Sequence, residues 1–339
     1  MTLTCNRDGN FTILVIGDPQ LDWPEVEHEG PEEIGILLER VSPDLVILNG
    51  DIMTVNDGLR IVRDMDEDYL SRLIAPIEER RIPWAYNTGN HDRFTEEHHR
   101  LFMQHQCLSA PVPADDPDYE ADRPLNYRLP IFSHDGKRQV FAVWGMDTGT
   151  YNKYGWEGLT HKQISWYRRT SEACGRVTGL LCCHIPFTQM VDLYYSKKDG
   201  GKAEVGERGD KYPLWGRMSF SLGEEHYVTD SGTVICGANG FCTTTCANDR
   251  GMLDAIREQG DIKIAVFSHE HHKNFVGNYN GILLGYSGKI SMGCGADELC
   301  RGGRVIRFNE SAPEAFETYW VGSVETSEDQ PPIKNEITP

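Results

Sequence analysis

The sequence predicts a fold of the α/β class, and two patterns lead to this prediction. Short apolar runs rich in β-branched residues alternate with segments whose apolar residues recur at helical spacing, which is typical of βαβ units with parallel strands. Polar side chains then follow the carboxyl ends of several apolar runs, where open α/β sheets bind their ligands. We therefore expect a ligand site at one rim of the predicted sheet.

The first part of the chain alternates buried strands with amphipathic helices. Residues 11–17 form an apolar run, and residues 31–41 place apolar side chains at helical spacing after a proline that suits a first helical turn. A second apolar run over 45–48, a long helix over 69–80 and a third strand over 82–87 follow. His98, His99 and His105 lie on a further predicted helix, where we expect them to be solvated.

The middle of the chain first breaks this alternation and then resumes it. Residues 109–130 are rich in proline and in acidic residues, which predicts a solvated loop. A strand over 139–145, a helix over 161–173 and a strand over 177–184 follow, and we expect the nearby Trp144, Trp156 and Trp166 in the core. Residues 197–250 are rich in glycine and charge without periodicity. So long an irregular insertion suggests a function, and the insertion, together with Tyr194, Tyr195 and Arg250, is a candidate substrate wall.

The last part returns to strands, which are predicted over 264–267, 274–277, 281–285 and 304–308. No linker divides the chain, so we expect one domain over 9–322 that carries the insertion of about 197–250. A polar tail over 323–339 follows and is expected to be frayed.

Charge and hydropathy exclude several classes of partner. The 339 residues include 33 Lys and Arg against 52 Asp and Glu, a formal net charge of −19, which disfavours nucleic acids and anionic membranes as partners. No apolar run approaches the ~18 residues of a membrane-spanning helix, and the first residues lack the apolar stretch of a signal peptide. We therefore expect a cytoplasmic protein without membrane contact, whose oligomeric state the sequence leaves open.

The ten cysteines follow no disulfide or zinc-ribbon spacing. Cys182 and Cys183 lie in an apolar run, where cysteine behaves as a small hydrophobic residue. Cys236, Cys242 and Cys246 could ligate a metal or form a disulfide bond, but we favour free thiols for them.

Five predicted strands end in residues that could ligate a metal. Carboxylate, amide and imidazole groups without thiolates suit a divalent ion such as Mn, Fe, Zn, Ni or Mg. Each residue alone is more often a turn former or a structural polar group, but five such groups in step with the strand pattern favour a metal site. In chain order they are Asp18, Gln20, Asp51, Asn90, His91, Asp92, His184, His269 and His271.

These groups resemble a known set of motifs. Asp18-x-Gln20, Gly50-Asp51, Gly89-Asn90-His91-Asp92, His184 and His269-x-His271 are similar to the five blocks DxH, GDxx, GNH(D/E), H and GHxH of the calcineurin-like metallophosphoesterases. The resemblance covers about residues 11–308, and its later half is most similar to the branch with plant purple acid phosphatases labelled inactive and a yeast cell-cycle phosphatase. It implies a four-layer α/β/β/α sandwich of two mixed sheets flanked by helices.

The resemblance also implies a reaction and a set of roles. The chain would hydrolyse a small phosphoester, with a monoester slightly favoured over a diester, through attack on phosphorus by a hydroxide between two divalent ions. His91 would protonate the leaving group, Asp92 would fix the loop, and Arg93 would reach a phosphate oxygen or pair with a surface acid. The implied ligands are Asp18, Gln20 and His271 for the first ion, Asp51 as the bridge, and Asn90, His184 and His269 for the second ion.

Two departures from the family pattern leave alternatives open. Gln20 stands where the family more often has His, so the first ion could bind weakly, with Mn or Fe favoured, or Gln20 could lie outside the ligand set. Thr54 stands where purple acid phosphatases have the Tyr that binds ferric iron, which argues against a purple centre. The alternative functions are a metal- or phospholigand-binding protein without turnover and a nuclease of the same superfamily, which the missing basic stripe disfavours.

Overall fold

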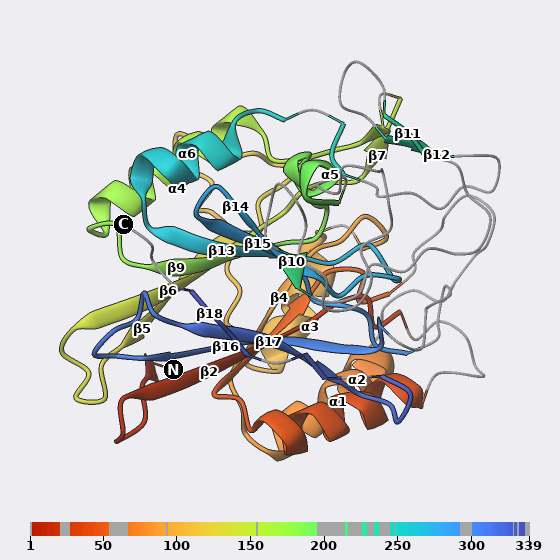
Figure 1. Ribbon diagram of the computed structural model, residues 1–339, viewed down its shortest axis with the longest axis vertical. Helices are drawn as coiled ribbons and strands as arrows, with labels where there is room; N and C mark the ends of the chain where they lie inside the picture. The colour runs from red at the N-terminus through yellow and green to blue at the C-terminus, as the bar shows by residue number, and fades with distance from the viewer. Residues whose placement is uncertain are drawn as a thin grey trace.

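The structure is a computed structural model, and two large mixed β-sheets lie face to face in it with helices on their outer faces (Figure 1). It describes residues 2–20, 28–53, 67–92, 94–153, 155–194, 214–215, 226–228, 234–236, 245–247, 249–291, 300–327, 329–330 and 332–335. The order of layers is helix, sheet, sheet, helix, which confirms the predicted four-layer α/β/β/α sandwich.

The six-stranded sheet has the order β18-β17-β16-β2-β3-β4. Strands β2, β3 and β4 are parallel, and β16 pairs antiparallel with β2. Ile16 is level with Leu48, and Asn49 with Asn87, so the carboxyl ends of these three strands meet at one edge. The strand bounds are β2 Asn10–Ile16, β3 Leu45–Asn49, β4 Trp84–Asn87, β16 Gly302–Asn309, β17 Glu317–Gly322 and β18 Ile333–Lys334.

The eight-stranded sheet has the order β1-β5-β6-β9-β13-β15-β14-β10. Its four central strands β6, β9, β13 and β15 are parallel. The strand bounds are β1 Leu3–Thr4, β5 Asn126–Phe132, β6 Gln139–Met146, β9 Gly179–Cys183, β10 Leu214–Trp215, β13 Ile262–Phe267, β14 Val276–Tyr279 and β15 Ile282–Tyr286. Two small hairpins pair β7 Tyr151–Asn152 with β8 Gly155–Trp156, and β11 His226–Val228 with β12 Val234–Cys236.

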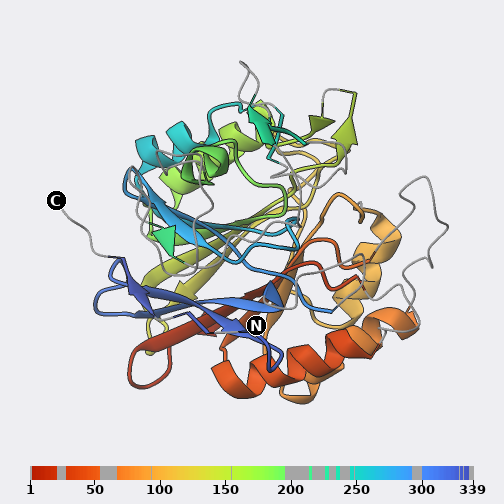
Figure 2. The same ribbon diagram turned by 45° about the vertical axis from the view of Figure 1, so that its right-hand side comes forward.

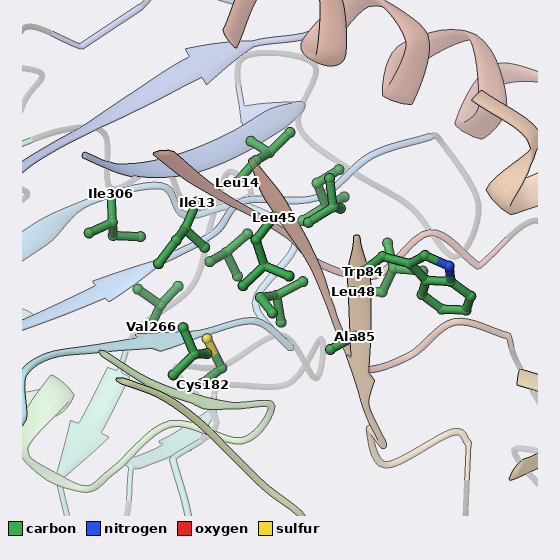
Figure 3. Close-up of a cluster of buried hydrophobic side chains, with 14 of the residues drawn as sticks. Ile13, Leu14, Leu45, Leu48, Trp84, Ala85, Cys182, Val266 and Ile306 are labelled. Atoms are coloured by element: carbon green, nitrogen blue, oxygen red, sulfur yellow. The ribbon is translucent and has the colours of Figure 1, made fainter. Parts of the chain in front are cut away.

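The core lies between the two sheets. Ile13, Leu45 and Ile306 of one sheet belong to the same buried cluster as Cys182 and Val266 of the other (Figure 3). The next residues along β9 and β13 point the opposite way, into a second cluster under the helices. Strands buried on both faces need continuous apolar runs, which is why these segments could be recognised from the sequence.

Six helices cover the outer faces of the two sheets in the part of the chain that the structure describes (Figures 1 and 2). Their bounds are α1 Glu29–Val41, α2 Glu67–Glu79, α3 Glu96–Gln104, α4 His161–Ala173, α5 Gln189–Tyr194 and α6 Met252–Gln259. The first three lie on the side of the six-stranded sheet, and the others on the side of the eight-stranded sheet. Among the described residues, no helix combines the length and the apolar character that crossing a membrane requires.

Several predictions from local sequence are wrong in detail. The loop predicted over 109–130 ends in β5, whose sequence contains Pro130. β1 pairs only with Ile131 and Phe132, so Pro130 lies at an edge position, where sheets tolerate proline. Neither α6 nor β17 was apparent from periodicity alone.

The tail is also more ordered than predicted. β18 pairs with β17, and the buried Gln330 donates to the carbonyl of Asn274 at 3.0 Å. The expectation of a frayed tail is therefore wrong for these residues, because their backbone completes the edge of the sheet. The division into a domain over 9–322 and a tail stays a prediction.

The histidines around α3 are not merely solvated. His99 Nδ1 lies 3.0 Å from the hydroxyl of Tyr86, and His105 lies 2.8 Å from Glu67 and 3.1 Å from Glu78. Both side chains therefore hold α3 to its neighbours, which corrects the expectation of simple solvation.

Some predictions fall outside the described residues. These are most of the insertion over 197–250 and the residues Thr54, Arg93, Tyr195 and Cys242. Cys182 and Cys183 are buried free thiols, and Cys246 is also buried. Trp144 and Trp166 are buried as predicted, with their rings 5.6 Å apart.

Candidate metal centre

The predicted ligands come together where the carboxyl ends of five strands from both sheets meet. Asp18, Asp51 and Asn90 follow β2, β3 and β4 of the six-stranded sheet. His184 follows β9, and the segment with His269 and His271 follows β13, both in the eight-stranded sheet. The centre therefore lies across the seam between the sheets, and neither sheet supplies all of it.

The loops that carry these residues have unusual backbone geometry. Asp18, Asp51 and His269 have φ angles of 49°, 49° and 72°, in the left-handed region that L-residues seldom adopt. Hydrogen bonds hold the loops there, since the N–H of Asp18 donates to the carbonyl of Gly50 at 3.1 Å and that of Gln20 to Asp51 at 3.3 Å. Such conformations persist only where the surroundings enforce them, and they gather at functional sites.

Asp51 lies at the middle of the centre and is almost fully buried, with a relative exposure of 1%. Its Oδ1 accepts a hydrogen bond from the backbone N–H of His91 at 2.9 Å. Its Oδ2 lies 3.2 Å from Nε2 of His184 and 4.0 Å from Nε2 of His91. Burial alone would raise the pKa of Asp51, but the nearby imidazoles of His184 and His91 hold it well below the usual range. The carboxylate is therefore ionised.

A backbone carbonyl orients the ring of His184 so that its Nε2 faces the centre. Its Nδ1 lies 3.0 Å from the backbone carbonyl of Asn49. Because a carbonyl only accepts, Nδ1 carries a hydrogen, and Nε2 faces Asp51 and, at 3.0 Å, Oδ1 of Asn90. Burial lowers the pKa of His184, but the carboxylates of Asp51 and Asp18 outweigh this effect and raise it to about 10. Without a metal ion, a proton therefore balances the local negative charge.

His269 completes one candidate ligand group with Asp51 and His184. One possible ligand atom from each of the three lies within 4.8 Å of the others. Burial and the neighbouring His184 lower the pKa of His269 well below its ordinary value, so the ring is neutral. Its Nε2 is buried without a hydrogen-bond partner among the described residues. A neutral imidazole with a buried, unpaired nitrogen is well suited to bind a metal ion.

Asp18, Asp51 and His271 form a second candidate group within the same 4.8 Å limit. Asp18 Oδ2 accepts from the backbone N–H of His269 at 3.1 Å, whereas Oδ1 lies 3.4 Å from Nε2 of His271. This Oδ1 is buried without a hydrogen-bond partner in the described part of the chain. The two groups share Asp51, so the donor set fits two ions with one bridging carboxylate.

Gln20 lies beside this second group, but its amide oxygen points toward Lys289 and its amide nitrogen points toward Asp51. Its Oε1 accepts a hydrogen bond from Nζ of the buried Lys289 at 2.9 Å, and its Nε2 faces Oδ2 of Asp51 at 3.5 Å. The oxygen that a metal would require is therefore engaged by a lysine, and the side that faces the centre is a hydrogen-bond donor.

His91, Asp92 and Arg93, predicted respectively to act on the leaving group, to fix the loop and to reach a phosphate, differ in position. His91 is the more accessible of them, with 26% of its side chain exposed beside Asp51. Asp92 is buried, and its two oxygens accept from the backbone N–H groups of Ile52 at 2.6 Å and Gly89 at 2.9 Å. Asp92 therefore joins two loops of the centre and does not face a substrate. Arg93 lies outside the described residues.

Burial and the charge of Asp51 raise the pKa of Asp92 well above its ordinary value. The raised pKa follows from the position of Asp92 behind the centre, next to another carboxyl group.

Sequence patterns missed four contributors to the centre. Asn49 orients His184 through its carbonyl, and Thr150 Oγ1 donates to the carbonyl of Asn90 at 3.1 Å. Trp156, predicted to be a core residue, is only half-buried, and its ring lies 4.4 Å from that of His269 at an angle of 77°. Lys289 alone carried a signal, because it follows β15 as the other site residues follow their strands.

The amino-acid sequence of this chain matches one protein family and several known proteins. The calcineurin-like phosphoesterase family matches residues 11–273. Probable inactive purple acid phosphatase 14 of Arabidopsis thaliana is 22% identical over 328 residues, which cover 84% of this chain and 72% of the relative. Probable inactive purple acid phosphatase 29 of the same plant is 26% identical over 275 residues, which cover 73% of this chain and 59% of the relative.

A solved structure supports the fold assignment. The crystal structure of a dimetal phosphatase from Danio rerio has a TM-score of 0.55 with this chain at 11% identity, and the match covers 96% of this chain and 99% of that one. At this identity the likeness shows the fold.

Proposed function

Because the chain belongs to the calcineurin-like phosphoesterase family, we propose that it binds two divalent metal ions and hydrolyses a small phosphoester, with monoesters favoured over diesters. One observation carries this proposal: two candidate ligand groups share the buried Asp51, and His91 lies beside them. Mn, Fe, Zn and Ni are the candidate ions, since the donors are carboxylate oxygen and imidazole nitrogen. The zebrafish relative of the same fold is itself named a dimetal phosphatase.

The proposed ligands are the residues of the two groups together with Asn90. Asp51 would contact both ions, Asp18 and His271 would hold the first, and Asn90, His184 and His269 would hold the second. A bound pair of divalent ions supplies an acidified water and positive charge for the phosphoryl oxygens. Metal binding requires that His184 release its proton, which the bound positive charge favours.

The chain itself contributes orientation and proton transfer. The carbonyl of Asn49 keeps Nε2 of His184 directed at the centre, and Asp92 holds the two loops on which Asp51 and His91 lie. We assign to His91 the protonation of the leaving-group oxygen, because its imidazole lies beside Asp51 with 26% of its side chain exposed. Arg93 follows it directly in the sequence and stays a predicted phosphate contact.

The test compares leaving groups of different basicity. The protein, loaded with Mn²⁺, Fe²⁺, Zn²⁺ or Ni²⁺ in turn, is assayed with p-nitrophenyl phosphate, phenyl phosphate and bis-p-nitrophenyl phosphate. In His91→Ala, turnover of phenyl phosphate should fall much more than that of p-nitrophenyl phosphate, because a poor leaving group depends more on protonation. His134→Ala, at a histidine paired with Glu310 on the surface, is the control. Absence of turnover with every ion and ester would contradict the proposal.

A second candidate is a protein that binds metal and phosphate without turnover. The observation that favours it is the contact of Lys289 with the amide oxygen of Gln20, which removes one donor from the expected ligand set. If this candidate is right, titration calorimetry should detect binding of Mn²⁺ and inorganic phosphate to the chain. The chain should then hydrolyse none of the three esters. Gln20→His would then restore turnover if the missing donor is the cause.

A further inference from the structure

The segment that follows β15 is hydrogen-bonded to the first ligand loop, which spans residues 17–20. Three successive residues of the segment, Lys289, Ile290 and Ser291, make these hydrogen bonds. The N–H of Ile290 donates to the carbonyl of Gly17 at 3.3 Å, and Oγ of Ser291 donates to the carbonyl of Pro19 at 2.7 Å. Nζ of Lys289 donates to the carbonyl of Asp18 at 2.6 Å and to Oε1 of Gln20 at 2.9 Å.

Lys289 brings a positive charge into the interior of the molecule. Its side chain is fully buried, as are Asp18 and Gln20. An ammonium group is a donor only, and its charge strengthens the hydrogen bonds that it makes to oxygen. The amide oxygen of Gln20 is therefore held by a cation in competition with any metal ion, and the Gln20 amide nitrogen is left facing Asp51.

We propose that Lys289 is a positioning residue that makes the two metal positions unequal by withdrawing the amide oxygen of Gln20 from the first ion. The first position then keeps Asp18, Asp51 and His271, whereas the second keeps Asp51, Asn90, His184 and His269. The first position accordingly has the lower metal affinity, and its ion exchanges while the ion in the second position stays bound.

This inference rests on the metal binding of the proposed function but not on turnover. Binding of Mn²⁺ to the full chain is measured by equilibrium dialysis with elemental analysis, and electron paramagnetic resonance reports when two ions lie close enough to couple. We expect the native chain to bind one Mn²⁺ tightly and a second about tenfold or more weakly, the scale on which residues behind a ligand change metal affinity.

Two variants test the role of Lys289, and one serves as a control. Lys289→Met removes the donor that holds the amide oxygen of Gln20, and Gln20→Ala removes the amide itself. Lys289→Met should strengthen the weaker site about tenfold and bring the coupled signal to lower Mn²⁺ concentration, whereas Gln20→Ala should leave the ratio of the two affinities unchanged, because its amide oxygen does not serve the first ion. Arg304→Met removes another buried cation, which binds the carbonyl of Tyr286 at 3.1 Å and does not contact Gln20, and it should leave the ratio of the two affinities unchanged.

The outcomes separate the inference from the proposed function. Two Mn²⁺ ions of equal affinity in the native chain would overturn the inference and leave the proposed function standing. So would an unchanged ratio of affinities in folded Lys289→Met, a weaker first site in Gln20→Ala, or an equal effect of Arg304→Met. If Lys289→Met does not fold, Gln20→Ala decides alone. Failure of every protein to bind Mn²⁺ would overturn both.

Discussion

At the scale of single residues, the centre depends on a few side chains in which one polar atom is held by a hydrogen bond and the other faces the centre. Asp51 uses Oδ1 for the backbone of His91 and directs Oδ2 at His184. His184 has its Nδ1 committed to a carbonyl, so Nε2 is the atom that it can offer to a metal ion. These constraints orient the donors before any ion arrives, which lowers the entropic cost of binding.

Asp51→Asn should abolish binding of both ions and lower phosphatase turnover by several orders of magnitude, because the amide removes the negative charge shared by the two ligand groups. Mn²⁺ stoichiometry and hydrolysis of p-nitrophenyl phosphate measure the two effects. The matched control is Asp261→Asn, at a buried carboxylate that accepts hydrogen bonds from Tyr167 and Ser171. It should cost about 1–3 kcal/mol of unfolding free energy and leave Mn²⁺ binding intact. Equal metal binding in both variants would contradict the assignment of Asp51.

At the scale of elements, the close approach of neighbouring loops sets the geometry. A Cβ on Gly89 would lie 2.1 Å from Oδ1 of Asp51 and 2.3 Å from its backbone nitrogen. A Cβ on Gly50, whose φ is +87°, would lie 2.5 Å from Nδ1 of His184. The glycines of the two motifs are thus required by packing around the ligands.

Gly89→Ala should displace the loop that carries Asp51 and weaken Mn²⁺ binding by at least about tenfold. The control is Gly35→Ala in α1, where a Cβ would meet nothing within 4 Å. This change should stabilise the protein by about 1 kcal/mol, since alanine is the better helix former, without altering metal affinity. Equilibrium dialysis with Mn²⁺ and chemical denaturation measure the two quantities. Native affinity in Gly89→Ala would show that the loop adapts to the added methyl group.

The contact between α3 and β4 should make stability depend on pH. Burial lowers the pKa of His99 from its usual 6.5, so the neutral ring is favoured in the folded state. Its contribution is complete above pH 6.5 and is lost as the pH falls, because the unfolded chain takes up the proton first. The unfolding free energy of the native chain should therefore fall more between pH 7.5 and 5.5 than that of His99→Gln. Equal losses in urea denaturation would contradict this reading of the contact.

At the scale of the whole molecule, the candidate metal centre draws its residues from both sheets. Each candidate ligand group takes residues from both sheets, with Asp18 and Asp51 on one side and the three histidines on the other. The chain as a whole carries a net charge of −19, yet bound divalent ions would reverse the sign of the field at this one place. An acidic protein can in this way bind a phosphate ester.

Metal binding should therefore stabilise the whole fold. At a free Mn²⁺ concentration about a hundred times the dissociation constant, linkage predicts about 2.7 kcal/mol of added unfolding free energy. The melting temperature should rise with added Mn²⁺ and fall with a chelator, whereas that of Asp51→Asn should respond to neither. If neither added Mn²⁺ nor a chelator changes the melting temperature of the native chain, the proposal of a metal ion bound between the sheets is contradicted.

The sequence alone determined where the strands end and which chemical groups follow them. Apolar runs and polar residues after them are local patterns, so the α/β class and the set of candidate ligands could be predicted from them. Strands β5 and β17, each second from the edge of its sheet, were missed because burial mainly on one face leaves a weaker pattern.

The tertiary structure decided which atoms of these residues meet. The turn of Gln20 away from the centre, the tautomer of His184 and the contact of Trp156 with His269 each depend on a partner far away in the sequence. Periodicity carries information about neighbours along the chain, whereas the direction of a side chain is set by the elements that pack around it. For this reason the sequence could predict a metal centre, and only the fold could place Lys289 behind it.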